Sequence, residues 1–221
     1  MKLFISALTK FILGAVLVGL MLFLPAGSLQ YYDGWLFIGL LFCPMLILGA
    51  VLLVKTPELL RKRLDSKEKQ TEQKWVVGLL ALFFAAGFTV AGLDYRFGWT
   101  EMPLWATVTA SVVLLISYGL YAEVMRENSY VSRNVTVTEG QRVVDTGLYR
   151  IVRHPMYAVT VWLFLAIPIV LGSLPALLCF IPYPILMVVR IIGEERLLSK
   201  ELQGYEEYKK KVRYRLLPLI W

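Results

Sequence analysis

The residues best suited to chemistry lie in two short segments of the C-terminal half. The first contains Gly147-Leu148-Tyr149 and Arg153-His154-Pro155-Met156-Tyr157, and the second runs from Arg190 to Glu194 and Glu195. A guanidinium can hold a carboxylate through two parallel hydrogen bonds, and a tyrosine ring can face a positive centre. Carboxylates accept hydrogen bonds from amino and hydroxyl groups of a ligand. Together these residue types indicate a polar site at the ends of two helices.

The elements that must position these segments are two apolar helices joined as a hairpin. The chain is uncharged between Arg153 and Arg190, a run too long for one helix, and Gly172-Ser173-Leu174-Pro175 interrupts it. We expect arms at residues 155–171 and 175–189, whose polar ends meet. Prolines inside both arms favour packing against protein, because neighbouring groups must satisfy the carbonyls that each proline frees.

The rest of the chain is rich in candidate membrane spans. Of its 221 residues, 58% are hydrophobic and 18% are charged, which is far more apolar than an average soluble protein. Further uncharged stretches are mostly close to the ~20 residues that cross a bilayer. These stretches are residues 11–24, 34–54, 75–93 and 103–121. The sequence therefore predicts an all-α, polytopic membrane bundle of about six helices, including the short C-terminal hairpin.

The distribution of charge predicts the orientation. With six crossings, all of the 23 Lys and Arg residues except Arg96 lie on one side, which the positive-inside rule makes cytoplasmic. Both termini and the polar segments are then expected in the cytoplasm. The net charge of +7 suits attraction to anionic membrane lipid, so nucleic acid is not an expected partner.

Neither a metal site nor a disulfide is expected. Cys43 and Cys179 lie inside hydrophobic stretches, and His154 is the single histidine, so no zinc site is recognisable. At the N-terminus, Lys10, an apolar run and Ala26-Gly27-Ser28 resemble a signal peptide and its cleavage site. We expect this segment to be retained and to pair with the next span through a turn at residues 31–34. A mature mass beginning near Ser28 would contradict retention.

Polar segments connect these spans. Residues 55–74 suit a short connecting helix on the membrane surface, with apolar Leu59, Leu60 and Leu64 among many charges. Residues 123–153 form a long polar loop, in which a short extended hairpin around Glu139-Gly140 is possible. Its strands would contain Val135, Val137, Val143 and Val144.

The tail after Arg190 has helical spacing of its apolar residues. These residues are Leu197, Leu198, Leu202, Tyr205 and Tyr208. The spacing predicts an amphipathic C-terminal helix that folds back over the cytoplasmic face of the membrane.

Each residue of the polar site also suits an ordinary structural role. Arg153 could anchor a helix at lipid phosphates, and His154 could lie at the interface with its polar edge in water. The tyrosines suit the aromatic belt. Arg190 and Glu194, which share a helix face at i and i+4, could form a surface salt bridge worth less than ~1 kcal/mol. Only the combination favours a functional site.

The order and spacing of these residues resemble a known family. Gly-x-Tyr is followed by Arg-His-Pro-Met-Tyr, then by Arg190 with Glu-Glu-x-x-Leu, and then by Gly204-Tyr205 and Tyr208. In this combination, concentrated in residues 129–221, the chain resembles the isoprenylcysteine carboxyl methyltransferase family, which is related to membrane phospholipid methyltransferases. The resemblance implies a catalytic, cofactor-binding region at residues 123–221, joined to the four spans of residues 1–122 in one integrated membrane domain.

The resemblance also implies the ligands and their contacts. S-adenosyl-L-methionine is expected in a pocket that faces the cytoplasm, and a lipophilic substrate is expected to enter from the bilayer. Arg190 is the implied catalytic residue, which binds the substrate. The implied glutamate is Glu194 when counted from Arg190 and Glu195 when counted back from Gly204, and both stay candidates. The other implied cofactor contacts are Gln141, Arg142, Val143, Val144, Tyr149, His154, Pro155, Met156 and Tyr157.

Two positions depart from the pattern of that family. Leu148 replaces a frequent proline, which should not disturb a backbone turn. Val159 replaces a frequent glycine, and its added bulk could narrow the space near the cofactor or change which substrate fits.

Methyl transfer to a carboxylate needs little from the protein beyond positioning. A carboxylate attacks a sulfonium methyl without a general base, so alignment and exclusion of water are the main requirements. We expect Arg190 to grip the carboxylate, Tyr149 or Tyr157 to place a ring near the sulfonium, and a glutamate to receive an amino group or a ribose hydroxyl. Gly-x-Gly occurs nowhere in the chain, which argues against a Rossmann-type site.

Other functions fit parts of the same pattern. Related membrane methyltransferases modify phospholipid amines or isoprenoids, which leaves the acceptor open. Sterol-reductase-like membrane oxidoreductases that use NADPH contain a similar Arg-His-Pro-x-Tyr segment, although they are generally longer. A transporter usually carries ionisable residues inside its spans, and the first four spans contain no central charge. Nothing in the sequence indicates the oligomeric state.

Overall fold

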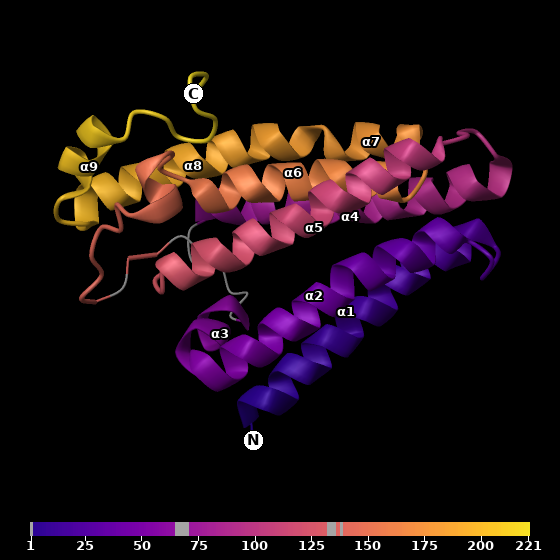
Figure 1. Cartoon of the computed structure of the whole chain (residues 1–221), viewed down its shortest axis with the longest axis horizontal. Coiled ribbons are helices and arrows are strands. Elements are labelled where there is room, and N and C mark those ends of the chain that lie inside the picture. The colour runs from indigo at the N-terminus through magenta and orange to yellow at the C-terminus, as the bar shows by residue number, and fades with distance from the viewer. Residues whose placement is uncertain (1, 65–70, 132–135, 138) are drawn as a thin grey trace.

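The computed structural model describes residues 2–64, 71–131, 136–137 and 139–221, which form a bundle of long helices (Figure 1). The chain begins with α1 (Lys2–Ala26), α2 (Tyr32–Lys55) and the short α3 (Pro57–Leu64). Two long helices follow, α4 (Thr71–Phe97) and α5 (Leu104–Glu127). Figure 1 shows α1 and α2 inclined to the other helices and diverging from them toward α3.

The predicted hairpin is present, with its second arm broken into two helices. The first arm is α6 (Pro155–Val170), and the second consists of α7 (Leu174–Phe180) and α8 (Pro182–Glu201). Gly172, in the turn between the arms, has a φ of 71°, which favours glycine. The 3₁₀ turn η1 (Gly147–Arg150) precedes the hairpin, and α9 (Tyr205–Lys211) follows it.

The bundle contains enough apolar helix to cross a membrane several times. Within the described residues, 5 helical segments have the length and composition of a span, and α6 is a shorter apolar helix. The last of the long segments combines α7 and α8. The prediction of an all-α, polytopic membrane bundle of about six helices is therefore confirmed.

Two boundaries differ from the sequence prediction. The turn between α1 and α2 lies at residues 27–31, because the chain is already helical from Tyr32. The second hairpin arm does not end near Val189, because α8 continues to Glu201 without a break. The polar segment from Arg190 to Glu195 is therefore part of the same helix as the apolar residues before it.

Glycines let α4 approach its neighbours closely. A Cβ atom at Gly92 would lie 2.4 Å from the backbone oxygen of Leu22 in α1, and one at Gly87 would lie 2.4 Å from the ring of Phe180 in α7. Small residues at such crossings allow the van der Waals packing that holds helices together in lipid. Leu22 and Phe180 belong to one core cluster with residues of α2, α5 and α6, so the glycines help to fix the frame that carries the site.

The C-terminal tail is not the single amphipathic helix that its periodicity predicts. Helix α8 ends at Glu201, and Gly204 adopts a φ of 83° that reverses the chain before α9. The apolar residues of the tail then pack on one another and on the loop before the hairpin, with Tyr205, Tyr208 and Val212 buried beside Val143, Leu198 and Leu202. The apolar face of the tail therefore covers protein, and the expected position of the tail over the cytoplasmic face of the membrane stays a prediction.

The polar connectors are only partly described. Helix α3 occupies part of the predicted connecting segment, and residues 65–70 lie outside the described residues. In the long loop, the described residues Val137, Val143 and Val144 form no strand, and Val135 lies outside the described residues.

Candidate active site

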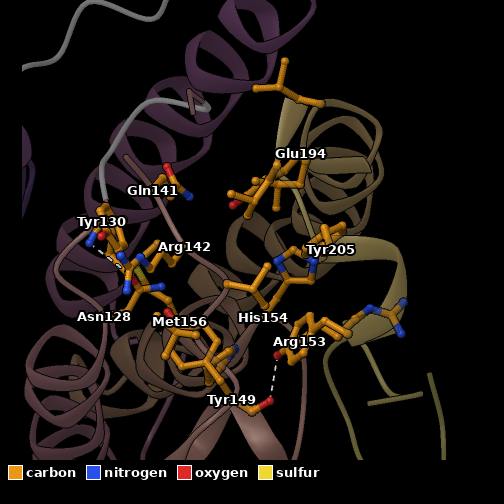
Figure 2. A pocket seen from close by; sticks show the side chains of 18 of the residues that line it. Asn128, Tyr130, Gln141, Arg142, Tyr149, Arg153, His154, Met156, Glu194 and Tyr205 are labelled. Carbon is orange, nitrogen blue, oxygen red and sulfur yellow. Dashed lines mark hydrogen bonds between the residues drawn. The ribbon is translucent and has the colours of Figure 1, made fainter. Parts of the chain in front are cut away.

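The ends of α5, α6 and α8, the long loop and α9 enclose a pocket (Figure 2). Its lining combines aromatic and apolar side chains with a few polar groups, which suits a small-molecule ligand. Figure 2 shows Gln141 and Arg142 on one side of the pocket and Glu194 and Tyr205 on the other. Every predicted site residue except Arg190 and Glu195 lines it: Gln141, Arg142, Val143, Val144, Tyr149, His154, Pro155, Met156, Tyr157 and Glu194.

The turn η1 holds Tyr149 in the pocket wall. The backbone N–H of Leu148 donates to Oε2 of Glu127 at 2.9 Å. Gly147 has a φ of 49°, and a Cβ atom there would overlap the Glu127 carboxylate, so glycine is favoured at this position. Tyr149 is buried, and its backbone oxygen accepts a 2.6 Å hydrogen bond from the hydroxyl of Tyr208. The Gly-x-Tyr pattern is thus explained by the geometry of this turn.

Arg153 and Glu195 form a buried ion pair beside the pocket. Nε of Arg153 donates to Oε1 of Glu195 at 2.7 Å, and its Nη1 donates to the backbone oxygens of Val212 and Arg213 at 2.8 and 2.7 Å. Nε of Arg215 donates to Oε2 of Glu195 at 2.8 Å. Arg153 is only 7% exposed, so it does not reach lipid phosphates. It joins the start of α6 to α8 and to the tail.

His154 is buried in the same network. Its Nε2 lies 3.3 Å from Oε1 of Glu195, and its ring stacks on Tyr157 with 5.8 Å between the ring centroids. Its backbone N–H donates to the carbonyl of Arg215 at 2.9 Å. Pro155 begins α6 at a position where its missing N–H leaves nothing unsatisfied. The water-exposed interfacial position considered for His154 is therefore not observed.

The adjacent glutamates have different surroundings. Glu194 lines the pocket, and its Oε2 accepts a 2.6 Å hydrogen bond from the Tyr157 hydroxyl. Glu195 is turned toward Arg153, His154 and Arg215. Successive residues of an α-helix point about 100° apart, so one of the two faces the pocket while the other faces the network. Glu194 thus has the position suited to a ligand, and Glu195 the position suited to structure.

Arg190 lies behind the pocket wall. It is 6% exposed, and its Nε donates to the Tyr157 hydroxyl at 3.1 Å. The same hydroxyl donates to Glu194, so Arg190, Tyr157 and Glu194 form a hydrogen-bonded chain between α8 and α6. In this hydrogen-bonded series, the side chain of Tyr157 lies between the Arg190 guanidinium and Glu194, which lines the pocket.

The sequence prediction misses part of the pocket wall. The helical periodicity of the tail from Leu197 to Tyr208 is a signal for some of these residues, because it marks an apolar face. The missed residues are Asn128, Tyr130, Val131, Thr136, Arg153, Leu197, Leu198, Leu202, Tyr205 and Tyr208.

Tyr205 is the most informative of the missed residues. It is 4% exposed, and its hydroxyl has no hydrogen-bond partner among the described residues. Burial, followed by the nearby charges of Glu195 and Glu194, raises the pKa of this hydroxyl, so it stays protonated and able to donate. A buried donor without a partner on a pocket wall fits a bound polar ligand.

Val159 does not lie on this pocket. It is buried and lines a separate apolar groove between α5, α6 and the tail, together with Trp162 and Leu217. The expected narrowing of the space near the cofactor is therefore not observed.

Part of the chain that contains most of the pocket is similar to a known protein family. Residues 108–200 match the model of the isoprenylcysteine carboxyl methyltransferase (ICMT) family. The match covers less than half of the 221 residues and shows a likeness to the ICMT family over this region. The chain is thus a multi-pass membrane methyltransferase that uses S-adenosylmethionine as its methyl donor. The ICMT match contains Tyr149, Arg190 and Glu194, and it excludes α1–α4 and α9. A search of curated proteins found no match.

Proposed function

We propose that the protein methylates the carboxylate of an isoprenylcysteine-like lipid. The observation that supports this proposal is the arrangement around Tyr157, which has the pocket carboxylate of Glu194 on one side and the guanidinium of Arg190 on the other. The family match supports the same acceptor, because a prenylated carboxylate is the substrate that the name of this family implies.

The pocket residues suit S-adenosylmethionine. Glu194 has the charge to bind the amino group or the accepting oxygens to bind a ribose hydroxyl, and the Tyr205 hydroxyl supplies a donor without a protein partner. Tyr149 and Tyr157 supply ring faces, which attract positive charge. The cofactor supplies a methyl group on a positive sulfur, which a carboxylate accepts without transfer of a proton. No general base is therefore needed among the residues of the site.

Arg190 is proposed to hold the reacting carboxylate. A guanidinium presents several donors in one plane, which matches the two oxygens of a carboxylate. The hydrogen bond from Arg190 to Tyr157 fixes one edge of this group. Burial of Arg190 also keeps water away from the carboxylate, which strengthens their attraction.

The test is methyl transfer by the detergent-purified full chain from S-adenosylmethionine with a tritiated methyl group. N-acetyl-S-farnesylcysteine and phosphatidylethanolamine serve as competing acceptors. A methyl ester releases labelled methanol in alkali, whereas a methylated amine keeps its label. We expect label in the farnesylcysteine that alkali releases, and label in lipid that resists alkali would instead favour a phospholipid methyltransferase.

Arg190→Ala provides the test of the catalytic residue. It is expected to lower turnover about 100-fold, because the carboxylate loses the group that aligns it with the sulfonium methyl, while cofactor affinity changes less than about twofold. The initial rate of methyl transfer and the affinity for S-adenosylmethionine are measured on the same preparation of the variant. Full turnover in Arg190→Ala would remove Arg190 from its proposed role.

A further inference from the structure

Residues 215–221, the tail loop, follow α9 and belong to no helix or strand. Leu216 is buried in a cluster with residues of α4, α6 and α8. Leu219 and Ile220, at the tip of the loop, are 84% and 77% exposed. Figure 1 shows this segment running beside α8, with its end projecting from the bundle. The tail loop is thus anchored in the bundle at one point and presents two large apolar side chains outward.

The tail loop lies beside the membrane-spanning part of the bundle. Leu216, Leu217 and Pro218 line an apolar groove together with residues of α5 between Val113 and Leu120. Helix α5 has the length and composition of a membrane span. The loop therefore reaches a level of the bundle that hydrocarbon surrounds.

The tail loop satisfies most of its own backbone donors. The backbone oxygen of Trp221 accepts three hydrogen bonds and that of Leu217 accepts two. The donors to Trp221 are the N–H groups of Arg215, Leu216 and Leu217 at 2.9, 3.0 and 3.3 Å, and the donors to Leu217 are those of Ile220 and Trp221 at 3.2 and 3.1 Å. Pairing of backbone groups within a segment is the condition for irregular backbone to leave water.

The exposed tip is held in one conformation. Leu219 has a φ of 67°, and it is the one residue other than glycine in the left-handed region among those that the structure describes. This conformation costs a leucine free energy, so the surrounding structure must maintain it. The hydrogen bonds to Leu217 and Trp221 on either side supply that constraint. The tip is therefore a built feature of the loop and is not free to fold against the bundle.

Basic residues precede the apolar tip. Lys210 and Arg213 are both exposed. Cations suit the anionic head groups of a membrane, and large apolar side chains next to them suit the acyl chains below. This combination favours lipid over a second protein as the partner of the tip.

The tail loop is also bonded to the frame of the pocket beside α9. The backbone oxygens of Tyr214 and Arg215 accept hydrogen bonds from the N–H groups of Arg153 and His154 at 2.8 and 2.9 Å. Nε of Arg215 donates to Glu195 at 2.8 Å. The position of the loop therefore affects the residues at the start of α6 that support the pocket.

We propose that Leu219 and Ile220 insert into the acyl chains of the membrane leaflet next to the pocket, and that this contact keeps the pocket in shape. Lys210 and Arg213 then face the anionic head groups of the same leaflet. The insertion does not depend on which acceptor is methylated. Its effect on the pocket rests on the proposed function, which places S-adenosylmethionine there.

A spin label tests the insertion directly. The full chain is reconstituted into nanodiscs of phosphatidylcholine and phosphatidylglycerol, and Cys43→Ala and Cys179→Ala remove its natural cysteines. Oxygen concentrates in hydrocarbon, whereas a charged nickel complex stays in water. We expect oxygen to reach the label at Leu219→Cys, as it does at Ile116→Cys on the exposed face of α5, and the nickel complex to reach the label at the exposed Lys210→Cys.

Two results would overturn the insertion. A label at Leu219→Cys that the nickel complex reaches as readily as at Lys210→Cys would place the tip in water. A label that neither reagent reaches would place the tip against a protein surface, such as a second copy of the chain.

The effect on the pocket is tested by calorimetric binding of S-adenosylmethionine in the same nanodiscs. Leu219→Glu puts a charge where acyl chains are expected and should weaken binding about tenfold. The control Leu104→Glu makes the same change at the far end of α5, where the side chain is 77% exposed, and should change binding less than about twofold. Leu219→Gly keeps the φ that glycine favours and removes the apolar side chain, so it should weaken binding about two- to fivefold.

The two parts of the proposal fail separately from the proposed function. If both Leu219 variants bind S-adenosylmethionine like the wild type, the effect on the pocket is overturned, and methyl-ester formation by the wild type would leave the proposed function intact. If the variants weaken binding as expected but the wild type forms no methyl ester, the proposed function fails and the effect on the pocket stands. A wild type that binds no S-adenosylmethionine would overturn the effect on the pocket, and the spin label would still decide the insertion.

Discussion

The pocket beside α9 and a second cavity, which lies between α1, α2, α3 and α5, are built differently. The pocket beside α9 is surrounded by side chains that hydrogen-bond one another, and the buried pair of Arg153 and Glu195 joins three segments beside it. The cavity beside α3 is enclosed by apolar side chains of helices whose outer surfaces are exposed, such as Leu13 of α1 at 65%. Buried hydrogen bonds thus hold the frame of the pocket, whereas apolar side chains enclose the second cavity.

The largest expected effect is a loss of stability when the buried ion pair beside the pocket is broken. Glu195→Ala leaves Arg153 buried without its carboxylate, which should cost about 3–5 kcal/mol of stability. The matched variant Glu194→Ala removes a pocket carboxylate beside it and should lower the melting temperature much less. Thermal unfolding in detergent measures both. Equal losses of stability would show that the two glutamates do not differ as their contacts suggest.

A smaller effect separates a ligand-binding hydroxyl from a structural one. The Tyr208 hydroxyl bonds to Tyr149, so Tyr208→Phe should lower stability by about 1 kcal/mol. The Tyr205 hydroxyl has no partner among the described residues, so Tyr205→Phe should leave stability unchanged and weaken S-adenosylmethionine about two- to tenfold. Melting temperature and calorimetric affinity measure the two outcomes.

The pH dependence of cofactor binding refines this comparison. Because burial raises the pKa of the Tyr205 hydroxyl, this hydroxyl keeps its proton at every pH up to about 9. The ratio of wild-type to Tyr205→Phe affinity should therefore be constant from about pH 7 to 9. A ratio that falls toward one as the pH rises would mean that the hydroxyl loses its proton there.

The smallest expected effect concerns the departure from the family pattern at Val159. This side chain lines the apolar groove beside Trp162 and not the pocket beside α9. Val159→Ala should therefore change S-adenosylmethionine affinity less than about twofold. A tenfold change in the calorimetric affinity would show that Val159 acts on the pocket through α6.

The sequence predicts the helices from local patterns, and the family resemblance of its motifs supplies half of the residues that line the pocket. Uncharged length identifies the spans, and the glycines and prolines identify the hairpin. The choice between Glu194 and Glu195 does not follow from spacing, since two motif counts give two answers. Their contacts with Tyr157 and Arg153 distinguish them, and these contacts join segments far apart in the chain.

The tail and α3 show why the remainder is not predictable. Helical periodicity from Leu197 to Tyr208 identifies an apolar face but cannot tell whether lipid or protein covers it. The charged segment of α3 suits a membrane-surface connector, and its position beside Met156 arises only from tertiary packing. In both cases the sequence shows the amphipathic character, and the fold decides what it contacts.

The most direct test of the central claim is calorimetric binding of S-adenosylmethionine to the detergent-purified wild type and to Glu194→Gln. The wild type is expected to bind one equivalent, and the loss of a charged hydrogen-bond acceptor should weaken binding about ten- to 100-fold. Equal affinity in both proteins would contradict the assignment of Glu194 to the cofactor, and a folded wild type that binds no S-adenosylmethionine would contradict the assignment of the pocket.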